Sequence, residues 1–202
     1  MHTFDLRTLD PLNVYKLLCG LVTPRPIALV TSQDAEGRVN AAPFSYFNVF
    51  GSEPPVLVIS VGDRPDNGAP KDTAANIEAT RQYVVHLVDE AIAERMNQTS
   101  KNYPHGVNEM AEAGFTALPS AAVRPPRIAE SPVHMECELE QILRIGANRL
   151  IIGRVLLLHV SEEIVDPARH HVRDGTFFPI GRMHGLGWYT KTREQFEMKR
   201  PK

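Results

Sequence analysis

The sequence predicts a mainly β fold with helical insertions, folded as a closed antiparallel barrel or sandwich. Two observations carry this prediction. Several short segments have strand patterns and are joined mostly by short links, and helical segments do not alternate with them regularly. A parallel doubly wound sheet needs that regular alternation, so it is not expected here.

Length and composition indicate one domain over residues 1–202, with a core at about residues 10–190 and a charged tail at 190–202. The net charge of −2 and the scattered basic residues predict neither a nucleic-acid partner nor a membrane-binding patch. No apolar run approaches the ~20 residues of a membrane span, and the N-terminus lacks a signal-peptide pattern. Cys19 and Cys137 lack metal-ligand spacing and the histidines are dispersed, so we expect no metal site and a reducing, cytoplasmic location.

A hairpin in residues 23–48 provides the first two expected strands. The first strand is Pro26–Ser32, and the second runs over residues 38–45 after a polar turn. Pro43 lies inside the second strand and removes one ladder donor, which predicts an edge, a bulge or a bend at this point.

The later strands are expected to differ in burial. Val56–Val61 is almost wholly apolar, so both of its faces should be covered, and residues 48–53 before it should form a loop. Val133–Arg144 alternates, which predicts a solvent face that carries His134 and Glu136. The other expected strands are Tyr83–Val88, Leu150–Val160 with Gly153 at a bulge or close backbone approach, and the mixed segment Ile164–Val172.

Helical segments are expected between these strands, each with an identifiable start or stop. They are Leu12–Cys19 between Pro11 and Gly20, Thr73–Thr80 with Asp72 or Thr73 as its N-cap, Glu90–Thr99, and Asn108–Ala113 before Gly114. Residues 115–127 are rich in Pro and Ala and predict an irregular crossing segment.

Small polar residues gather at both ends of the hairpin, where folding does not require them. Thr31 and Ser32 lie at one end of the hairpin, and Asn40, Ser45 and Asn48 lie at the other. Short hydroxyl and amide side chains beside a bent strand suit a flat ligand that forms hydrogen bonds close to the backbone. We take this as a hypothesis that other segments must support.

A second polar segment, Lys71-Asp72-Thr73, precedes the helix at residues 73–80, and Arg64 lies in the loop before it. Cations and free N–H groups at a helix N-terminus bind anions such as phosphate. Taken alone, this segment is explained as well by an ordinary capped helix with a solvated lysine. Together, a ring wall at the hairpin and a phosphate clamp fit flavin mononucleotide (FMN).

Three motifs in order carry a resemblance to a known family. Residues 23–32 resemble its first core strand, residues 40–47 (NAAPFSYF) resemble its N-x-A-P-[FY]-S-x-F signature, and residues 71–77 (KDTAANI) resemble its phosphate-binding motif. Residues 146–155 resemble a strand pair in its C-terminal half. On these grounds the chain resembles the flavin reductase-like family with the FMN-binding split β-barrel, and most closely its flavoredoxin-type branch, over about residues 10–190.

The resemblance implies a fold, a cofactor and a set of contacts. The fold would be a closed antiparallel split barrel, and the protein a homodimer with FMN near the subunit interface. The implied cofactor-binding residues are Arg25, Thr31, Ser32, Ala42, Pro43, Ser45, Arg64, Lys71, Asp72 and Thr73. Within this set, residues 31–45 would face the ring and ribityl chain, and the basic residues with Thr73 would hold the phosphate.

The implied activity is that of an oxidoreductase that passes electrons from NAD(P)H or a protein donor through bound FMN to free flavin or another acceptor. Many nicotinamide-using members carry a histidine where this chain reads Gly146-Ala147-Asn148-Arg149, so use of NAD(P)H stays open. His184 is the candidate to approach the flavin, with a structural loop histidine as the alternative. The rival functions are a non-catalytic flavin-binding or storage protein and a split barrel for another phosphorylated ligand.

Overall fold

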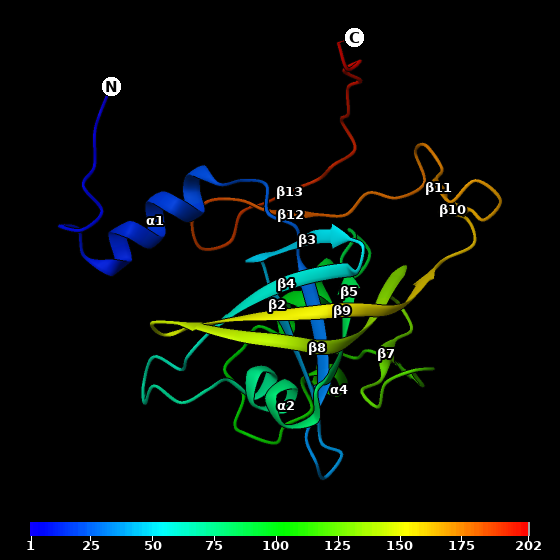
Figure 1. The fold of residues 1–202 in the computed structure, drawn as a ribbon, viewed down its shortest axis with the longest axis horizontal. Coiled ribbons are helices and arrows are strands. Elements are labelled where there is room, and N and C mark those ends of the chain that lie inside the picture. Colours follow the sequence, from blue (N-terminus) through cyan, green and yellow to red (C-terminus); the bar gives the residue numbers. More distant parts are fainter. Residues whose placement is uncertain (202) are drawn as a thin grey trace.

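The computed structural model describes residues 1–201, and a seven-stranded antiparallel sheet dominates it (Figure 1). The strands lie in the order β2-β1-β5-β8-β9-β4-β3. Their bounds are β1 Ala28–Gln33, β2 Val39–Phe44, β3 Phe47–Ser52, β4 Pro55–Gly62, β5 Gln82–Leu87, β8 Val133–Ile145 and β9 Asn148–Val160. The prediction of a mainly β fold with helical insertions is confirmed.

Helices and short two-stranded ribbons complete the chain. The helices are α1 Pro11–Leu21, α2 Asp72–Thr80, α3 Ala93–Gln98 and α4 Glu109–Glu112. The ribbons pair β6 Ala117–Leu118 with β7 Arg127–Ile128, β10 Val165–Asp166 with β11 His171–Val172, and β12 Gly181–Arg182 with β13 Tyr189–Thr190. Among residues 1–201, no helix is both long and apolar enough to cross a membrane.

The outer strands of the sheet are β2 and β3, which follow one another in the chain. No ladder joins these two strands in residues 1–201, so closure of the barrel stays a prediction. Pro43 lies opposite Leu29 in the β1–β2 ladder. Its missing N–H therefore falls on an edge strand, where a proline is tolerated, and this confirms one of the placements expected for it.

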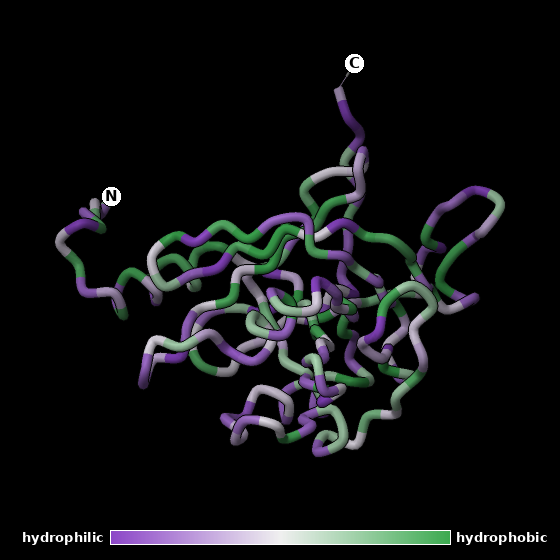
Figure 2. Tube along the Cα trace, turned by 60° about the horizontal axis from the view of Figure 1, so that its bottom comes forward, coloured by the Kyte–Doolittle hydropathy of each residue, from purple (hydrophilic) through white to green (hydrophobic). Residues whose placement is uncertain are grey.

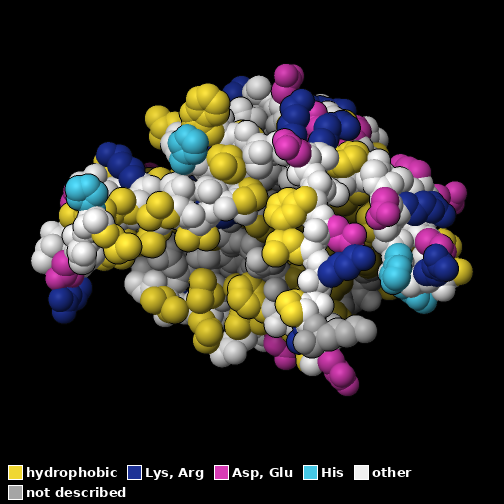
Figure 3. Space-filling model, turned by 90° about the horizontal axis from the view of Figure 1, so that it is seen from above, with side chains coloured by type: hydrophobic (Ala, Val, Ile, Leu, Met, Phe, Trp, Pro, Cys, Tyr) yellow, Lys and Arg dark blue, Asp and Glu magenta, His cyan; other side chains and the backbone are white. Residues whose placement is uncertain are grey.

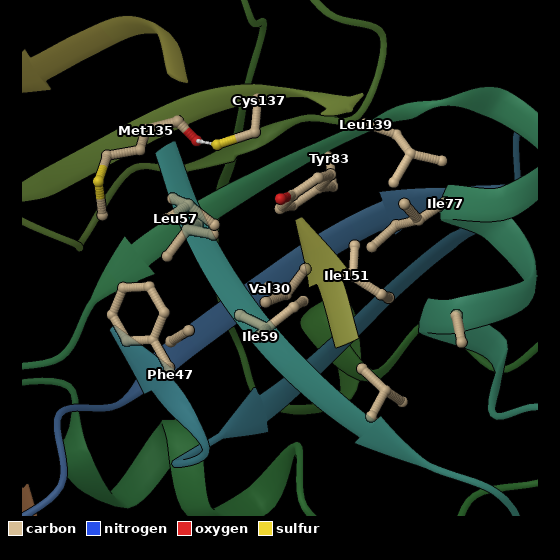
Figure 4. Close-up of a cluster of buried hydrophobic side chains, with 14 residues drawn as sticks. Val30, Phe47, Leu57, Ile59, Ile77, Tyr83, Met135, Cys137, Leu139 and Ile151 are labelled. Carbon is tan, nitrogen blue, oxygen red and sulfur yellow. Dashed lines mark hydrogen bonds between the residues drawn. The ribbon is translucent and has the colours of Figure 1, made fainter. Parts of the chain in front are cut away.

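Two clusters of buried side chains form the core. The first packs the sheet against α2 and includes Val30, Tyr83 and Ile77 (Figure 4). The second packs β1 against α3 and α4 and includes Leu29 and Met96. Because consecutive strand residues point to opposite faces, β1 contributes to both clusters and is buried on both sides.

Two expectations about element boundaries are wrong. The helix α1 continues through Gly20 to Leu21, with Pro11 as its first residue and the Asp10 carboxylate accepting a hydrogen bond from the Asn13 N–H. Residues 48–53 are not a loop, since β3 spans Phe47–Ser52 and pairs with β4. Its register shifts between Val49 and Gly51, and this irregularity hid the strand from pattern reading.

Two expectations about side-chain environment are also wrong. Lys71, rather than Asp72 or Thr73, is the N-cap residue of α2, and no side chain caps this end. The face of β8 predicted to meet solvent is partly buried, because His134 is 7% and Glu136 0% exposed. The segment 119–127 covers this face, and the Glu136 carboxylate accepts hydrogen bonds from the Ala121 and Ala122 N–H groups.

The C-terminal tail is hydrophilic at its end (Figure 2) and forms no regular element over residues 191–201. Its first part is nevertheless attached to the domain. Lys191 and Arg193 both pair with Glu90, at 2.7 and 2.6 Å. These ion pairs hold the strand β13, which precedes the tail, close to the segment before α3.

Gly153 in β9 lies where another side chain needs the space. A Cβ atom at this position would overlap the Tyr83 hydroxyl and would lie 2.7 Å from Cζ of the same ring. Tyr83 is fully buried in the core, so its ring has little freedom to move away. Of the bulge or close approach expected at Gly153, the structure shows a close approach, made by the Tyr83 side chain.

We therefore expect Gly153→Ala to lower the free energy of unfolding by about 1–3 kcal/mol, the usual effect of overpacking a core. Urea unfolding measures the change. Gly187→Ala is the matched control, because a Cβ at Gly187 meets no atom within 4 Å. Equal unfolding midpoints for the two variants would contradict the steric account.

His86 is a fully buried histidine held in one neutral form. Its Nδ1 lies 2.9 Å from the Leu29 carbonyl oxygen, and its Nε2 accepts a hydrogen bond from the Ile128 N–H at 3.0 Å. One nitrogen must therefore donate and the other accept, which only the neutral ring can do. Burial, with the nearby His134 as a smaller cause, lowers the pKa of His86 to about 3.

A lowered pKa makes stability depend on pH in a defined direction. The unfolded chain binds a proton at His86 below pH 6.5 and the folded chain only near pH 3, so this stability is complete above pH 6.5 and is lost as the pH falls toward 3. His86→Gln keeps a donor and an acceptor without titrating. As the pH falls over this range, the unfolding free energy of the variant should decrease less steeply than that of the wild type. The two slopes should differ by up to about 1.4 kcal/mol per pH unit. The unfolding free energy of both proteins would be measured with urea at several pH values in this range. The same dependence on pH for both proteins would contradict the assignment.

Candidate cofactor site

The main cavity has a volume of about 560 Å³ and lies between β2, the start of α2 and the loop that follows α3. Pockets that hold cofactor-sized ligands have volumes of about 300–1,000 Å³, so this cavity is large enough for one. Its lining residues are Asn40, Ala42, Pro43, Phe44, Arg64, Pro65, Asp66, Lys71, Asp72, Thr73, Thr99, Ser100, Lys101, Asn102, Tyr103 and Glu109.

One wall of the cavity is the second half of β2. Ala42, Pro43 and Phe44 are half-buried and present small and apolar groups to the cavity. Because β2 is an edge strand, backbone groups on its outer side are not used by a neighbouring ladder. This wall offers a flat apolar surface beside backbone donors and acceptors.

The opposite end of the cavity is the N-terminus of α2. No side chain caps this helix, and its first N–H groups point out of the first turn. Lys71 is exposed at the cap position, and Arg64 pairs with Asp72 at 2.8 Å. The helix dipole and the two basic side chains make this end of the cavity suited to an anion.

A buried polar network connects these two ends. We assign the Asn40 amide so that its nitrogen donates to Glu109 Oε1 at 3.2 Å and its oxygen accepts from the Thr73 hydroxyl at 2.8 Å, because the opposite orientation places like groups together. Glu109 also accepts a hydrogen bond from the Ala41 N–H at 3.0 Å. Burial raises the pKa of the Glu109 carboxyl, and the charge of Asp72 raises it further.

Most of the predicted cofactor residues lie around this cavity. Ala42, Pro43, Arg64, Lys71, Asp72 and Thr73 line it directly. Ser32 does not; it lies in the buried network, where its hydroxyl is 3.2 Å from the Asn76 amide nitrogen. Thr31 is fully buried and donates a hydrogen bond to the Pro126 carbonyl at 2.6 Å, outside the cavity lining.

Arg25 is also outside this lining, and its guanidinium serves the backbone. It donates hydrogen bonds to the carbonyl oxygens of Cys19 at 2.6 Å and Val22 at 2.8 Å, and to that of Met183 at 3.3 Å. The residue is 7% exposed. Its charge thus joins the end of α1 to the segment around β12.

A second cavity of about 200 Å³ shares Pro43, Phe44 and Ser100 with the first. Ser45 lines this second cavity, as does Tyr189. The lining residues here are Ile27, Pro43, Phe44, Ser45, Met96, Asn97, Ser100, Arg182, Leu186 and Tyr189. The two cavities therefore meet at the same wall of β2.

His184 lies apart from the lining of both cavities. Its side chain is exposed and stacks on Trp188 with ring centroids 6.0 Å apart. A role of His184 at the flavin therefore stays a prediction, with a structural loop histidine as the alternative.

Sequence reading missed the loop from Thr99 to Tyr103 and the carboxylate of Glu109. Both line the main cavity. The polar run Ser100-Lys101-Asn102 after an expected helix was the available signal for the loop. Glu109 gave none, because an acidic residue in the first turn of a helix is ordinary and its burial depends on α4 packing against β2.

Comparison with known proteins agrees with this geometry. A family model described as a flavin reductase like domain matches residues 21–185. An uncharacterized protein of Deinococcus radiodurans is 41% identical over 205 residues, which cover 98% of this chain and 90% of the relative.

Solved structures give the same answer. Nitrilotriacetate monooxygenase component B from Bacillus cereus is 35% identical with a TM-score of 0.92, covering 98% of both chains. The 2-nitrobenzoate 2-nitroreductase NbaA from Pseudomonas fluorescens is 36% identical with a TM-score of 0.90, covering 99% of this chain and 96% of that one. Flavoredoxin of Desulfovibrio vulgaris, at 18% identity and a TM-score of 0.76, shares the fold. The predicted resemblance is confirmed, and the chain belongs to the flavin reductase-like family.

Proposed function

We propose that the protein is an FMN-dependent oxidoreductase that passes electrons from NAD(P)H or a protein donor through bound FMN to free flavin or another acceptor. The observation that carries this proposal is the main cavity, which joins an uncapped helix N-terminus to a flat apolar strand wall. A phosphorylated cofactor with a planar ring needs both features in one cavity.

The residues present fit FMN. Lys71, Arg64 and the first N–H groups of α2 would hold the phosphate, and the wall formed by Ala42 and Pro43 would lie beside the ring. The fully buried Ser32 hydroxyl would hold the Asn76 amide, the Thr31 hydroxyl would hold the Pro126 carbonyl, and Thr73 would fix Asn40. When bound, FMN would supply the redox chemistry, and the protein would supply position and electrostatics.

The relatives support a redox role. Two structures at 35% and 36% identity are described as a monooxygenase component and as a nitroreductase. In this proposal, the protein would reduce a flavin for a partner oxygenase, or it would reduce a small acceptor. A cytoplasmic location, expected from the two unpaired cysteines, belongs to the same proposal.

A second copy of the chain would complete the molecule. Hydrophobic side chains gather on the face that carries β3 and α1 (Figure 3). On the edge strand β3, Val49 and Phe50 are 61% and 68% exposed, and Leu158 of β9 is 60% exposed. An edge strand with exposed apolar residues is a poor surface for a monomer, so we include a homodimer in the proposal.

The absorbance spectrum of the protein, purified without added cofactor and after FMN addition, tests the cofactor. Flavin bands that remain with the protein through gel filtration are expected. Anaerobic mixing with NADH and NADPH then tests the activity, and bleaching of the bound flavin by either nucleotide identifies the donor. If neither nucleotide nor a reduced protein donor bleaches it, the storage function replaces the reductase.

We expect Lys71→Ala to weaken FMN binding by roughly 10- to 100-fold, because a charge-assisted contact contributes about 1.5–3 kcal/mol. Quenching of flavin fluorescence measures the Kd, and the difference between the proteins should shrink as salt is raised. Lys16→Ala, on α1 and outside the cavity, is the matched control. An unchanged Kd in the Lys71 variant would place the phosphate elsewhere.

A further inference from the structure

We propose that the second cavity binds a molecule with a single conjugated ring and a hydrogen-bond-accepting oxygen, and that Ser45 donates the hydrogen bond. The inference deepens the proposed function, since such a molecule next to the flavin wall would be an electron acceptor. Binding itself can be measured without flavin, so the two proposals can fail separately.

The volume of the second cavity limits the size of the ligand. Its volume of about 200 Å³ lies below the range of about 300–1,000 Å³ that holds drug-sized ligands. One ring with small substituents fits this volume better than a flavin or a dinucleotide. Apolar or aromatic residues make up six of its ten lining residues, with Phe44, Met96 and Tyr189 among the larger groups.

Ser45 provides a hydrogen-bond donor in this mixed polar and apolar lining. Its hydroxyl oxygen accepts a hydrogen bond from Arg25 Nε at 3.4 Å. Among residues 1–201, no acceptor is recorded for the Ser45 hydroxyl proton, so this proton is available to a ligand. The neighbouring guanidinium, itself fixed on three carbonyl oxygens, makes an oxygen that carries partial negative charge the favoured partner.

The remaining wall is preformed. Arg25 and Arg182 exchange backbone hydrogen bonds of 3.0 and 2.8 Å, which fix β12 beside the start of the hairpin. The Arg182 guanidinium then donates to the Leu186 carbonyl at 2.7 Å and lies over the Tyr189 ring at 4.8 Å. Since Leu186 and Tyr189 line the cavity, both arginines act as positioning residues for it.

Besides Ser45, four lining side chains carry polar groups, namely Asn97, Ser100, Arg182 and Tyr189, and the first two serve as comparisons. The Ser100 hydroxyl donates to the Asn97 carbonyl at 2.6 Å, so its proton is already used. The Asn97 amide is exposed and is the rival donor. The structure favours Ser45 because Arg25 fixes its position.

Acetophenone and α-methylstyrene form a matched pair of probes, since they share one shape and only the first has an acceptor oxygen. Their affinities would be measured by ligand-observed NMR titration on wild type, Ser45→Ala, Ser100→Ala and Asn97→Ala, with and without saturating FMN. We expect wild type to prefer acetophenone by about 3- to 10-fold, the contribution of one hydrogen bond. Ser45→Ala should lose this preference, and Ser100→Ala and Asn97→Ala should keep it.

Tyr189→Ala tests the location, and it should weaken both probes about equally by removing a wall. Loss of the preference in Asn97→Ala but not in Ser45→Ala would overturn the assignment of the donor. Competition between FMN and acetophenone would assign the cavity to the flavin ring and overturn the inference. Failure of FMN to bind, with the probe preference intact, would instead count against the proposed function alone.

Discussion

The hydrogen bonds of the Asn40 amide hold the candidate site together. This one side chain lies on β2 and joins the Thr73 hydroxyl on α2 to the Glu109 carboxylate on α4. Unpaired polar groups in a buried position destabilise a fold, so each partner fixes the others. The distance between the strand wall and the helix N-terminus is therefore set by a satisfied network rather than by loops.

Sequence reading predicted the parts of the fold that depend on local pattern. The long strands, three of the helices to within a few residues and the close approach at Gly153 follow from periodicity and glycine placement. The strand β3 escaped because its bulge between Val49 and Gly51 breaks the period. The burial of Glu136 was not predicted, because the segment 119–127 covers β8 and the alternating pattern within β8 carries no information about that segment.

The candidate site also has parts that the sequence predicts and parts that depend on contacts between distant segments. Motif residues whose position is set by the backbone around them, such as Pro43 and Lys71, line the main cavity. Arg25 shows the opposite case, since a buried arginine beside a motif satisfies carbonyl oxygens instead of lining the cavity. The spacing of residues along the chain cannot separate these roles, because both depend on which segment approaches the guanidinium in space.

Whether the main cavity can bind a phosphate depends on its net charge. The number of acidic residues in the lining alone does not give this charge, because some of them are paired. Asp72 is paired with Arg64 at 2.8 Å and lies 3.1 Å from His105, which reduces its effect. Burial raises the pKa of the Glu109 carboxyl, and its two oxygens accept hydrogen bonds from the Asn40 amide and the Ala41 N–H. The exposed Lys71 and Lys101 and the positive end of α2 oppose the remaining negative charge of the lining, which includes the exposed Asp66. The basic groups thus lie at the α2 end of the cavity, where the proposed phosphate would bind, while the Glu109 carboxyl fixes the strand on which the proposed ring would lie.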